Sequence, residues 1–188
     1  MGIRYLQMFM DKKVMNGTYS VQMDREIRNA KKSTGKPLVV IDLNALFASI
    51  CSDKRDLLCG NQVRRMERIT GMFLKSLVDA GAELVFFNNG KLQPNKYEPW
   101  LTRKNDKYDL MINILDAINA RMPLNQIVEK FDRTIPPNTC LKLRRIVKQY
   151  GKIIISTDME CDQALAIYAT KHNALAVITH DTDFLIFE

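Results

Sequence analysis

Short apolar runs alternate along this chain with longer segments in which apolar residues recur every three or four positions. The runs at Leu38–Ile41 and Glu83–Phe87 predict buried strands, and Lys152–Ser156 predicts a third strand. A further strand is predicted at Ala174–Thr179. Helical spacing predicts helices from Asp42 through Ile50, at Gln62–Ala80, at about Asp106–Ala120, at Leu124–Phe131, and from Pro137 to about Tyr150. Strands that alternate with helices predict an α/β sandwich around a mainly parallel sheet.

The first 36 residues have a different pattern. Ile3, Leu6 and Met10 have near-helical spacing, which predicts a short helix up to about residue 11. Residues 12–36 are polar and basic, and we expect a solvated loop there, with a phosphate-tracking segment as the alternative. Because no internal repeat or low-complexity segment divides the chain, residues 1–188 are expected to form one domain.

Composition narrows the possible partners and compartments. Lysine and arginine number 28 against 21 acids, giving +7, and this charge favours a polyanionic partner such as nucleic acid. The four cysteines show no C-x-x-C spacing and there are two histidines, so zinc is not expected. No apolar run is long enough to span a membrane and no signal-peptide pattern opens the chain. We therefore expect an intracellular protein, nuclear or cytoplasmic.

Acidic residues gather where the predicted strands end. Asp42 follows the first strand, where open α/β sheets place their ligands, although it could instead cap the next helix unless Asn44 does so. Two further pairs, Glu160 with Asp162 and Asp181 with Asp183, lie on either side of a helix-like run, and the strand predicted at Ala174–Thr179 leads into the second pair. Carboxylates crowded into one cleft need a cation, and oxygen ligands favour Mg²⁺ or Mn²⁺.

Each acidic pair also has a purely structural interpretation, as helix capping or as a loop that satisfies its own backbone. Glu160 and Asp162 would diverge by roughly 200° inside a helix. They converge only if Glu160 precedes the helix or opens its first turn, with Thr157 or Asp158 as the cap. Asp181 and Asp183 can share one face if they extend the last strand.

Basic and aromatic residues are interleaved between Lys91 and Tyr108, with Tyr97 and Trp100 among them. Such a segment suits neutralisation of phosphates together with stacking of bases, although a single tryptophan more often packs half-buried. This basic and aromatic segment leads into the two helices that are predicted at about Asp106–Ala120 and at Leu124–Phe131.

Motifs along the whole chain resemble, in order, those of the flap-endonuclease/XPG superfamily of PIN-like nucleases. They are Met1-Gly2-Ile3-Arg4, V-V-I-D ending at Asp42, F-F-N-N-G-K around Asn89, Glu160-x-Asp162, and T-H-D-T-D at Thr179–Asp183. I-D-x-x-A-L-F and V-F-F-N-N-G followed by E-P-W-L-T-R are more specifically similar to Asteroid proteins and their relatives, the constitutive coactivators of PPAR-gamma. The ordered set is specific, whereas each motif alone is weak.

The resemblance implies a PIN-like α/β/α sandwich with a helical arch or gateway at about residues 91–137. It implies that two divalent ions are held by five acids, with Asn89 as a weaker ligand: Asp42, Glu160, Asp162, Asp181 and Asp183. Lys96 and Arg103, seven and fourteen residues after Asn89, match a phosphate-contacting pair at the base of the arch. The nucleic-acid-binding set that it implies comprises Gly2, Arg4, Lys91, Lys96, Arg103 and Lys104.

The activity implied is divalent-metal-dependent, structure-specific hydrolysis of phosphodiesters in DNA or RNA. The alternative is a catalytically weakened scaffold that binds RNA or protein. Asn89 favours the scaffold because the family nucleases carry aspartate there. A second departure from the family pattern is Arg4-Tyr5, which replaces a more usual glycine-containing turn and concerns how the N-terminus packs. Family nucleases also carry a further acid and a DNA-binding helical element after the D-x-D motif, so a chain ending at Glu188 is expected to be truncated at its C-terminus.

Overall fold

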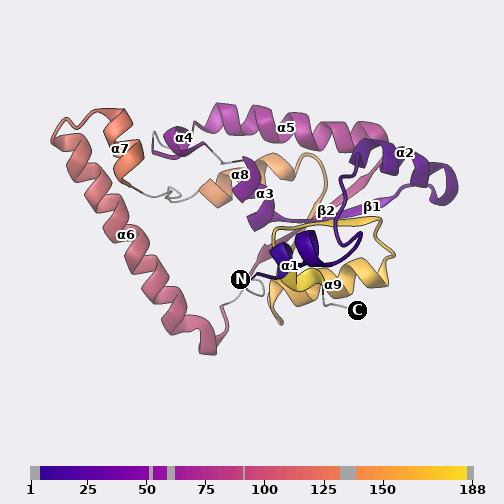
Figure 1. Cartoon of the computed structure of the whole chain (residues 1–188). Coiled ribbons are helices and arrows are strands. Elements are labelled where there is room, and N and C mark those ends of the chain that lie inside the picture. The colour runs from indigo at the N-terminus through magenta and orange to yellow at the C-terminus, as the bar shows by residue number, and fades with distance from the viewer. Residues whose placement is uncertain (1–4, 51–52, 59–61, 91, 132–138, 186–188) are drawn as a thin grey trace.

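The computed structural model describes the chain except residues 1–4, 51–52, 59–61, 91, 132–138 and 186–188 (Figure 1). The strands are β1 (Leu38–Asp42), β2 (Glu83–Asn89), β3 (Lys152–Ser156) and β4 (Ala176–Ile178). The helices are α1 (Leu6–Lys13), α2 (Met23–Thr34), α3 (Leu43–Ile50), α4 (Lys54–Leu58), α5 (Val63–Ala80), α6 (Tyr97–Asn119), α7 (Leu124–Lys130), α8 (Thr139–Val147) and α9 (Cys161–Lys171), with short 3₁₀ turns η1 (Pro94–Lys96) and η2 (Thr182–Leu185).

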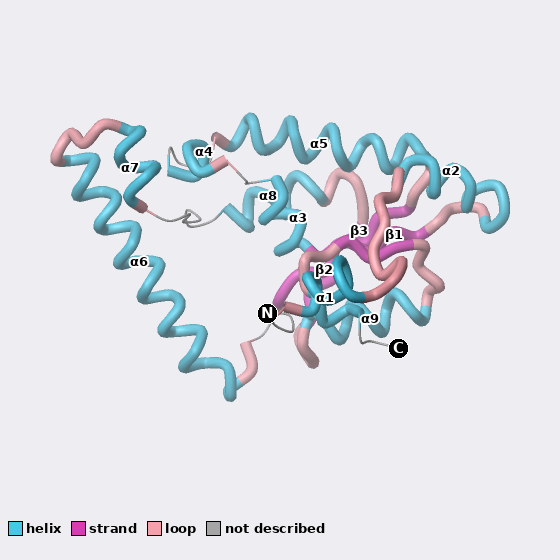
Figure 2. Tube along the Cα trace, in the orientation of Figure 1, coloured by secondary structure: helices cyan, strands magenta, loops and turns pink. Residues whose placement is uncertain are grey.

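All four described strands run parallel in the order β3-β2-β1-β4, which confirms the predicted α/β class. Figure 2 shows the strands in magenta between α5 and α9. Asp42 pairs with Phe87, and Asn89 pairs with Ser156. The carboxyl ends of β1, β2 and β3 therefore lie at one edge of the sheet, together with the end of β4, whose Ile178 pairs with Ile41.

The two faces of the sheet are covered by different helices. Val39 and Ile41 of β1 belong to a core cluster formed with α2, α3, α5 and α8. Val40 belongs to a second cluster formed with Leu165 of α9. Because side chains alternate along a strand, Asp42 shares the face of Val40 and lies on the α9 side.

Helix α2 corrects the expectation that residues 12–36 form a solvated loop. Met23, Ile27 and Ala30 recur at helical spacing, and Ile27 is fully buried in the larger core cluster. Asp24 and Glu26 lie in the first turn, where negative charge is favourable, and Gly35 caps the C-terminus with its backbone N–H. The basic side chains obscured this pattern because they occupy only the solvent side.

Helix α6 begins at Tyr97, about nine residues before the predicted start. Pro99 lies in its first turn, where the missing amide hydrogen costs little, so the proline starts the helix rather than excluding it. The helix leads away from the sheet layers and α7 returns beside it, joined through Ile114, Ala117 and Ile127 (Figure 1). Residues 91 and 132–138 of the expected arch lie outside the described residues.

Two other predictions need adjustment. Strand β4 covers only Ala176–Ile178, so it ends before the D-x-D motif. Helix α5 has nearly the predicted bounds. The helical spacing of its apolar residues predicts that Ile69 and Phe73 belong to the buried face, but both are exposed, and Thr70 and Leu74 are buried instead. No described helix is both long and apolar enough to cross a membrane. Cys140 and Cys161 carry free thiols, and the other two cysteines lie outside the described residues.

Candidate active site

Asp42 ends β1 and is 7% exposed. Its Oδ1 accepts a hydrogen bond from the Asn44 amide at 2.8 Å, and its Oδ2 accepts one from the Thr179 hydroxyl at 3.3 Å. Asp42 therefore caps α3 and also contacts the loop after β4. Asp42 thus does both things that the sequence allowed: Oδ1 caps the helix, and Oδ2 faces the candidate site.

Glu160 and Asp162 lie at the N-terminus of α9. Glu160 is the residue just before the helix, with an extended backbone of φ −62° and ψ 142°, and Asp162 lies in the first turn. This is the arrangement that allows the two carboxylates to converge. Neither Thr157 nor Asp158 caps α9, since Glu160 occupies the N-cap position, and the Thr157 hydroxyl donates to Asp158 at 3.1 Å.

Asp181 and Asp183 lie in a turn beyond β4 and not on a strand end, because η2 starts at Thr182. The Asp183 amide donates to Asp181 Oδ1 at 3.1 Å, and the Asp181 amide donates to the Thr179 hydroxyl at 3.1 Å. Thr179 thus links Asp42 to the backbone of Asp181. Turn geometry, rather than strand alternation, places these two acids.

The pKa values of Asp42 and Asp162 show that the acids form one electrostatic group. Burial raises the pKa of Asp42, and the negative charge of Asp181 raises it further. Burial likewise raises the pKa of Asp162, with added contributions from Asp181 and Asp42. A smaller contribution comes from Glu160. Carboxylates from β1, α9 and the loop after β4 therefore repel one another at a shared edge of the sheet.

A lysine neutralises one member of this group. Lys96 Nζ lies 2.7 Å from Glu160 Oε1, with side chains 48% and 34% exposed. Both residues line a pocket of about 210 Å³ that also includes Asn89, Trp100 and Asp162. The pocket therefore contains cationic, amide and carboxylate groups at the carboxyl ends of β2 and β3.

Asn89 and Gly90 form the β2 side of this pocket. Asn89 shares the α9 face of β2 with Val85 and Phe87, both of which pack in the smaller core cluster. At Gly90 an added Cβ would lie only 1.9 Å from the Ser156 carbonyl oxygen. Only glycine allows the backbone after β2 to approach β3 so closely.

The remaining basic residues are placed along α6. The Arg103 Nε donates to the Pro99 carbonyl at 3.0 Å, so its guanidinium lies along its own helix. Lys104 Nζ lies 5.3 Å from the centre of the Trp100 ring. Gly2, Arg4 and Lys91 lie outside the described residues.

Cys161 lies between Glu160 and Asp162 in sequence and is buried. Burial raises the pKa of its thiol to about 12, and the charges of Asp42 and Asp162 contribute to the shift. A thiol with this pKa stays protonated at neutral pH, which excludes a thiolate nucleophile here. The chemistry of the edge is therefore that of carboxylates.

The donor set fits a hard divalent cation chemically, since it consists of carboxylate oxygens, and burial raises the pKa of two of the carboxyl groups, Asp42 and Asp162. Among the described residues, however, no three histidine, cysteine or acidic side chains are placed so that together they could hold one ion. The side chains would have to turn toward one another to share it.

Three contributors to this edge were not foreseen. In the sequence Thr179 belongs to the T-H-D-T-D motif, and a hydroxyl residue between a strand and an acidic turn is a usable signal. Ser49 of α3 hydrogen-bonds His180 at 2.7 Å, a contact between residues 131 apart that no local pattern indicates. Ser156 donates to the Met159 carbonyl at 2.6 Å and so closes the turn that precedes Glu160.

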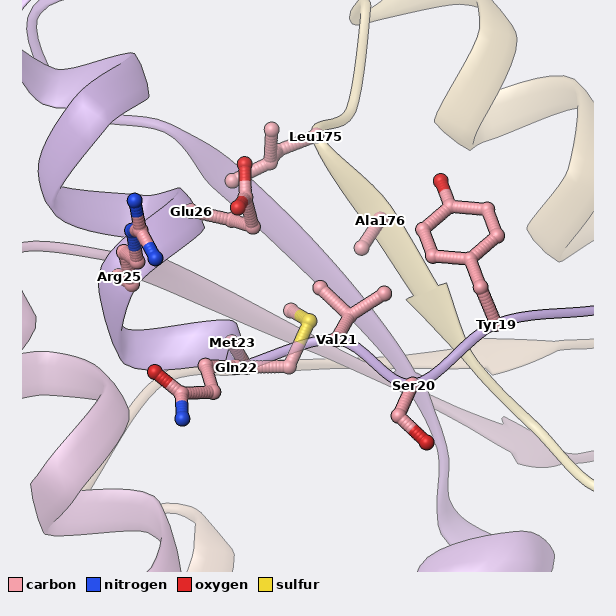
Figure 3. A pocket seen from close by; sticks show the side chains of 9 residues that line it. All are labelled: Tyr19, Ser20, Val21, Gln22, Met23, Arg25, Glu26, Leu175 and Ala176. Carbon is pink, nitrogen blue, oxygen red and sulfur yellow. The ribbon is translucent and has the colours of Figure 1, made fainter.

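A separate cavity of about 740 Å³ lies between the segment before α2 and the start of β4 (Figure 3). Tyr19, Val21 and Ala176 are among its lining residues. Its only charged members are Arg25 and Glu26, so it lacks the acidic character of the edge described above.

Comparison with known proteins gives three related sequences. The chain is 27% identical over 130 residues to the Mus musculus protein named constitutive coactivator of peroxisome proliferator-activated receptor gamma, 25% over 134 residues to that of Homo sapiens, and 24% over 157 residues to that of Bos taurus. These matches cover 69%, 70% and 82% of this chain but only 16%, 14% and 21% of the relatives. No family model matches. The chain is thus similar to one part of these coactivators.

Proposed function

We propose that this chain has a PIN-like fold and is a divalent-metal-dependent nuclease of the flap-endonuclease/XPG type. The observation that carries the proposal is the electrostatic coupling of Asp42, Asp162 and Asp181, which come from three separate segments. The chain as a whole carries a net charge of +7. Carboxylates that repel one another at the carboxyl ends of the strands nevertheless destabilise the folded state unless a cation among them offsets their charge.

Asp42, Asp162 and Asp181 would hold Mg²⁺ or Mn²⁺, with Glu160 and Asp183 beside them and Asn89 as a neutral oxygen donor. Two ions are expected in a fully active site. A bound divalent ion supplies an activated water and charge stabilisation at the phosphate. The chain's own part is to position these oxygens rigidly: β1 fixes Asp42, and the Thr179 hydroxyl ties it to the turn of Asp181.

Lys96 is the group of this chain that would contact the phosphate. Its ammonium group is bound to Glu160 in the structure, so it is already within reach of the acidic group. An incoming phosphodiester could exchange places with Glu160 as the partner of this ammonium. Arg103 would have to leave the Pro99 carbonyl to join it.

A second candidate is a scaffold without cleavage activity that binds RNA or protein. The Lys96 to Glu160 ion pair favours it, because an internal ammonium group replaces part of the charge that a metal would supply. Asn89 favours it too, because an amide oxygen holds a cation less tightly than a carboxylate. The names of the relatives, which describe coactivators, are compatible with protein partners.

Cleavage assays separate the two candidates. Labelled flap, hairpin and single-stranded RNA substrates are incubated with the protein and Mn²⁺, alongside Asp181→Ala and, as control, Asp79→Ala, which removes an exposed acid paired with Lys75 on α5. The proposal predicts cleavage that is lost in Asp181→Ala and kept in Asp79→Ala. Binding without any cleavage supports the scaffold.

A further inference from the structure

One face of α6 carries a continuous seam with coiled-coil spacing. Starting from Tyr97, its positions follow at alternating steps of four and three residues: Tyr97, Leu101, Lys104, Tyr108, Met111, Leu115 and Ile118. Six of these seven are apolar or aromatic. We call this set the α6 seam. Such a repeat over three heptads is the pattern with which helices pair.

None of the seven seam residues is buried; Leu101, Lys104 and Met111 are half-buried and the other four are exposed. The residues of α6 that are buried are Ile114 and Ala117, which pack on α7 through Ile127. The seam residues Tyr108, Leu115 and Ile118 are 50%, 56% and 46% exposed. Large apolar side chains that follow one stripe of an exposed helix mark an interaction surface.

The N-terminal part of the seam is already ordered as a stack. The Tyr97 and Trp100 rings are 6.1 Å apart and stacked, and Lys104 Nζ lies 5.3 Å from the Trp100 ring centre and 5.8 Å from that of Tyr108. The aromatic rings thus hold the one charged seam residue in place. Its alkyl chain can cover apolar surface while its ammonium group remains on the rings.

This chemistry fits another helix better than a nucleic-acid strand. A strand needs a positive charge near successive phosphates, but Lys104 is the only cation on the seam. Leu115 and Ile118, at the C-terminal end of the seam, can neither stack on nucleic-acid bases nor form hydrogen bonds with them. Aliphatic residues at heptad spacing instead fit the apolar stripe of a second helix.

We propose that the α6 seam is a homotypic interface, in which α6 of a second copy of this chain packs against it in the antiparallel direction. From Leu101 to Ile118 the seam positions are symmetric about their centre: Leu101 faces Ile118 of the second copy, Lys104 faces Leu115, and Tyr108 faces Met111. Each contact occurs twice, as a two-fold interface requires.

Charge selects this direction. In a parallel pair Lys104 would face its own copy in the centre of the seam, and like charges there are destabilising. Residues 97–107 carry three basic and two acidic residues, whereas 109–119 carry two acidic and no basic residues. Antiparallel pairing places the basic half of one helix beside the acidic half of the other.

The interface goes beyond the proposed hydrolysis because it uses none of the acids and no metal. Its test is the molar mass of the full chain in metal-free buffer, measured by sedimentation equilibrium over a range of concentrations. The proposal predicts a reversible dimer for the wild type. Met111→Glu, which puts a carboxylate in a central layer, should give the monomer mass. Asn113→Glu adds the same charge to the same helix outside the seam and should leave the dimer intact.

Direction is tested by mixing Leu101→Cys and Ile118→Cys proteins under mild oxidation and identifying cross-linked peptides by mass spectrometry. Antiparallel pairing predicts links between the two variants in large excess over links within either one. Trp100, the single tryptophan of the chain, flanks the seam, and its emission should shift to the blue as the dimer forms. A monomer at every concentration, or a dimer unaffected by Met111→Glu, would overturn the proposal. So would a monomer whose seam binds a single-stranded oligonucleotide and loses it in Met111→Glu.

Discussion

Lys96 and Glu160 form an ion pair of 2.7 Å between the N-terminus of α6 and the N-terminus of α9. The pair joins the basic segment of the chain to its acidic edge. It also sets a competition: a cation that binds Glu160 must displace the Lys96 ammonium group, and a phosphate that binds Lys96 must displace the Glu160 carboxylate. In a nuclease the metal ion and the phosphate would separate the pair, whereas in a scaffold Lys96 and Glu160 would stay paired.

Replacing Lys96 with glutamine should release Glu160 for a metal ion. We expect Mn²⁺ affinity to rise by about two- to fivefold, since partly exposed ion pairs are worth about 1 kcal/mol at most. Titration calorimetry measures the affinity. Lys75→Gln breaks a comparable pair with Asp79, 2.9 Å apart on α5, and should change nothing. Unchanged or weaker Mn²⁺ binding in Lys96→Gln would show that Glu160 is no part of the cation site.

Asp42→Asn should stabilise the metal-free protein near pH 7. Burial raises the pKa of Asp42 above its ordinary value of 3.8, so the folded state binds the proton more tightly than the unfolded chain does. Its contribution to stability is therefore full below about pH 4 and is lost as pH rises through the raised pKa. We expect a gain of about 1 kcal/mol at pH 7 and none at pH 3, measured by urea unfolding. A loss of stability at both pH values would contradict this account.

Asn89→Asp should speed metal-dependent cleavage by roughly tenfold if the neutral amide limits the site, because a carboxylate adds about 1.4 kcal/mol or more to cation binding. Single-turnover rates in Mn²⁺ on the substrate that the wild type cleaves provide the measurement. Asn113→Asp, on the exposed side of α6, serves as the charge-matched control. If the Asn89→Asp rate equals that of the wild type, the amide is not the limiting defect.

Gly90→Ala should destabilise the chain by about 1 to 3 kcal/mol, because its Cβ would overlap the Ser156 carbonyl oxygen at 1.9 Å and backbone cannot move aside easily. Urea unfolding measures the loss. Gly71→Ala in α5 is the matched control: the Cβ there meets only the Tyr150 hydroxyl at 2.9 Å, on a side chain that can turn away. Equal stabilities of the two variants would mean that the close approach of β2 and β3 is not a constraint.

The sequence predicted β1 and β2 well because they are buried on both faces and form unbroken apolar runs. Strand β3 has the predicted bounds, and β1 and β2 extend the predicted ones by a residue or two. Helix α2 was missed because its one buried position, Ile27, and the partly buried Met23 and Ala30 are hidden among basic residues. The start of α6 was misplaced because proline and a polar composition also describe loops.

The site was predictable in part. Asp42 and the α9 acids could be placed because strand ends and helix starts are local features. The turn that carries Asp181 and Asp183 could not be placed, because β4 ends one residue before the predicted Thr179 and such a difference changes the direction of both side chains. Contacts such as Lys96 with Glu160, or Ser49 with His180, depend on tertiary packing and leave no mark on nearby sequence.

Cation binding tests the central claim most directly. Thermal unfolding of the wild type, Asp181→Ala and Asp79→Ala is followed with and without Mg²⁺ or Mn²⁺. At a hundredfold excess over the dissociation constant a bound ion adds about 2.7 kcal/mol, so the wild type and Asp79→Ala should melt at clearly higher temperature. Asp181→Ala should show no shift. A wild type that does not respond to millimolar metal, or an Asp181→Ala variant that responds as the wild type does, would contradict a metal site at the acidic edge.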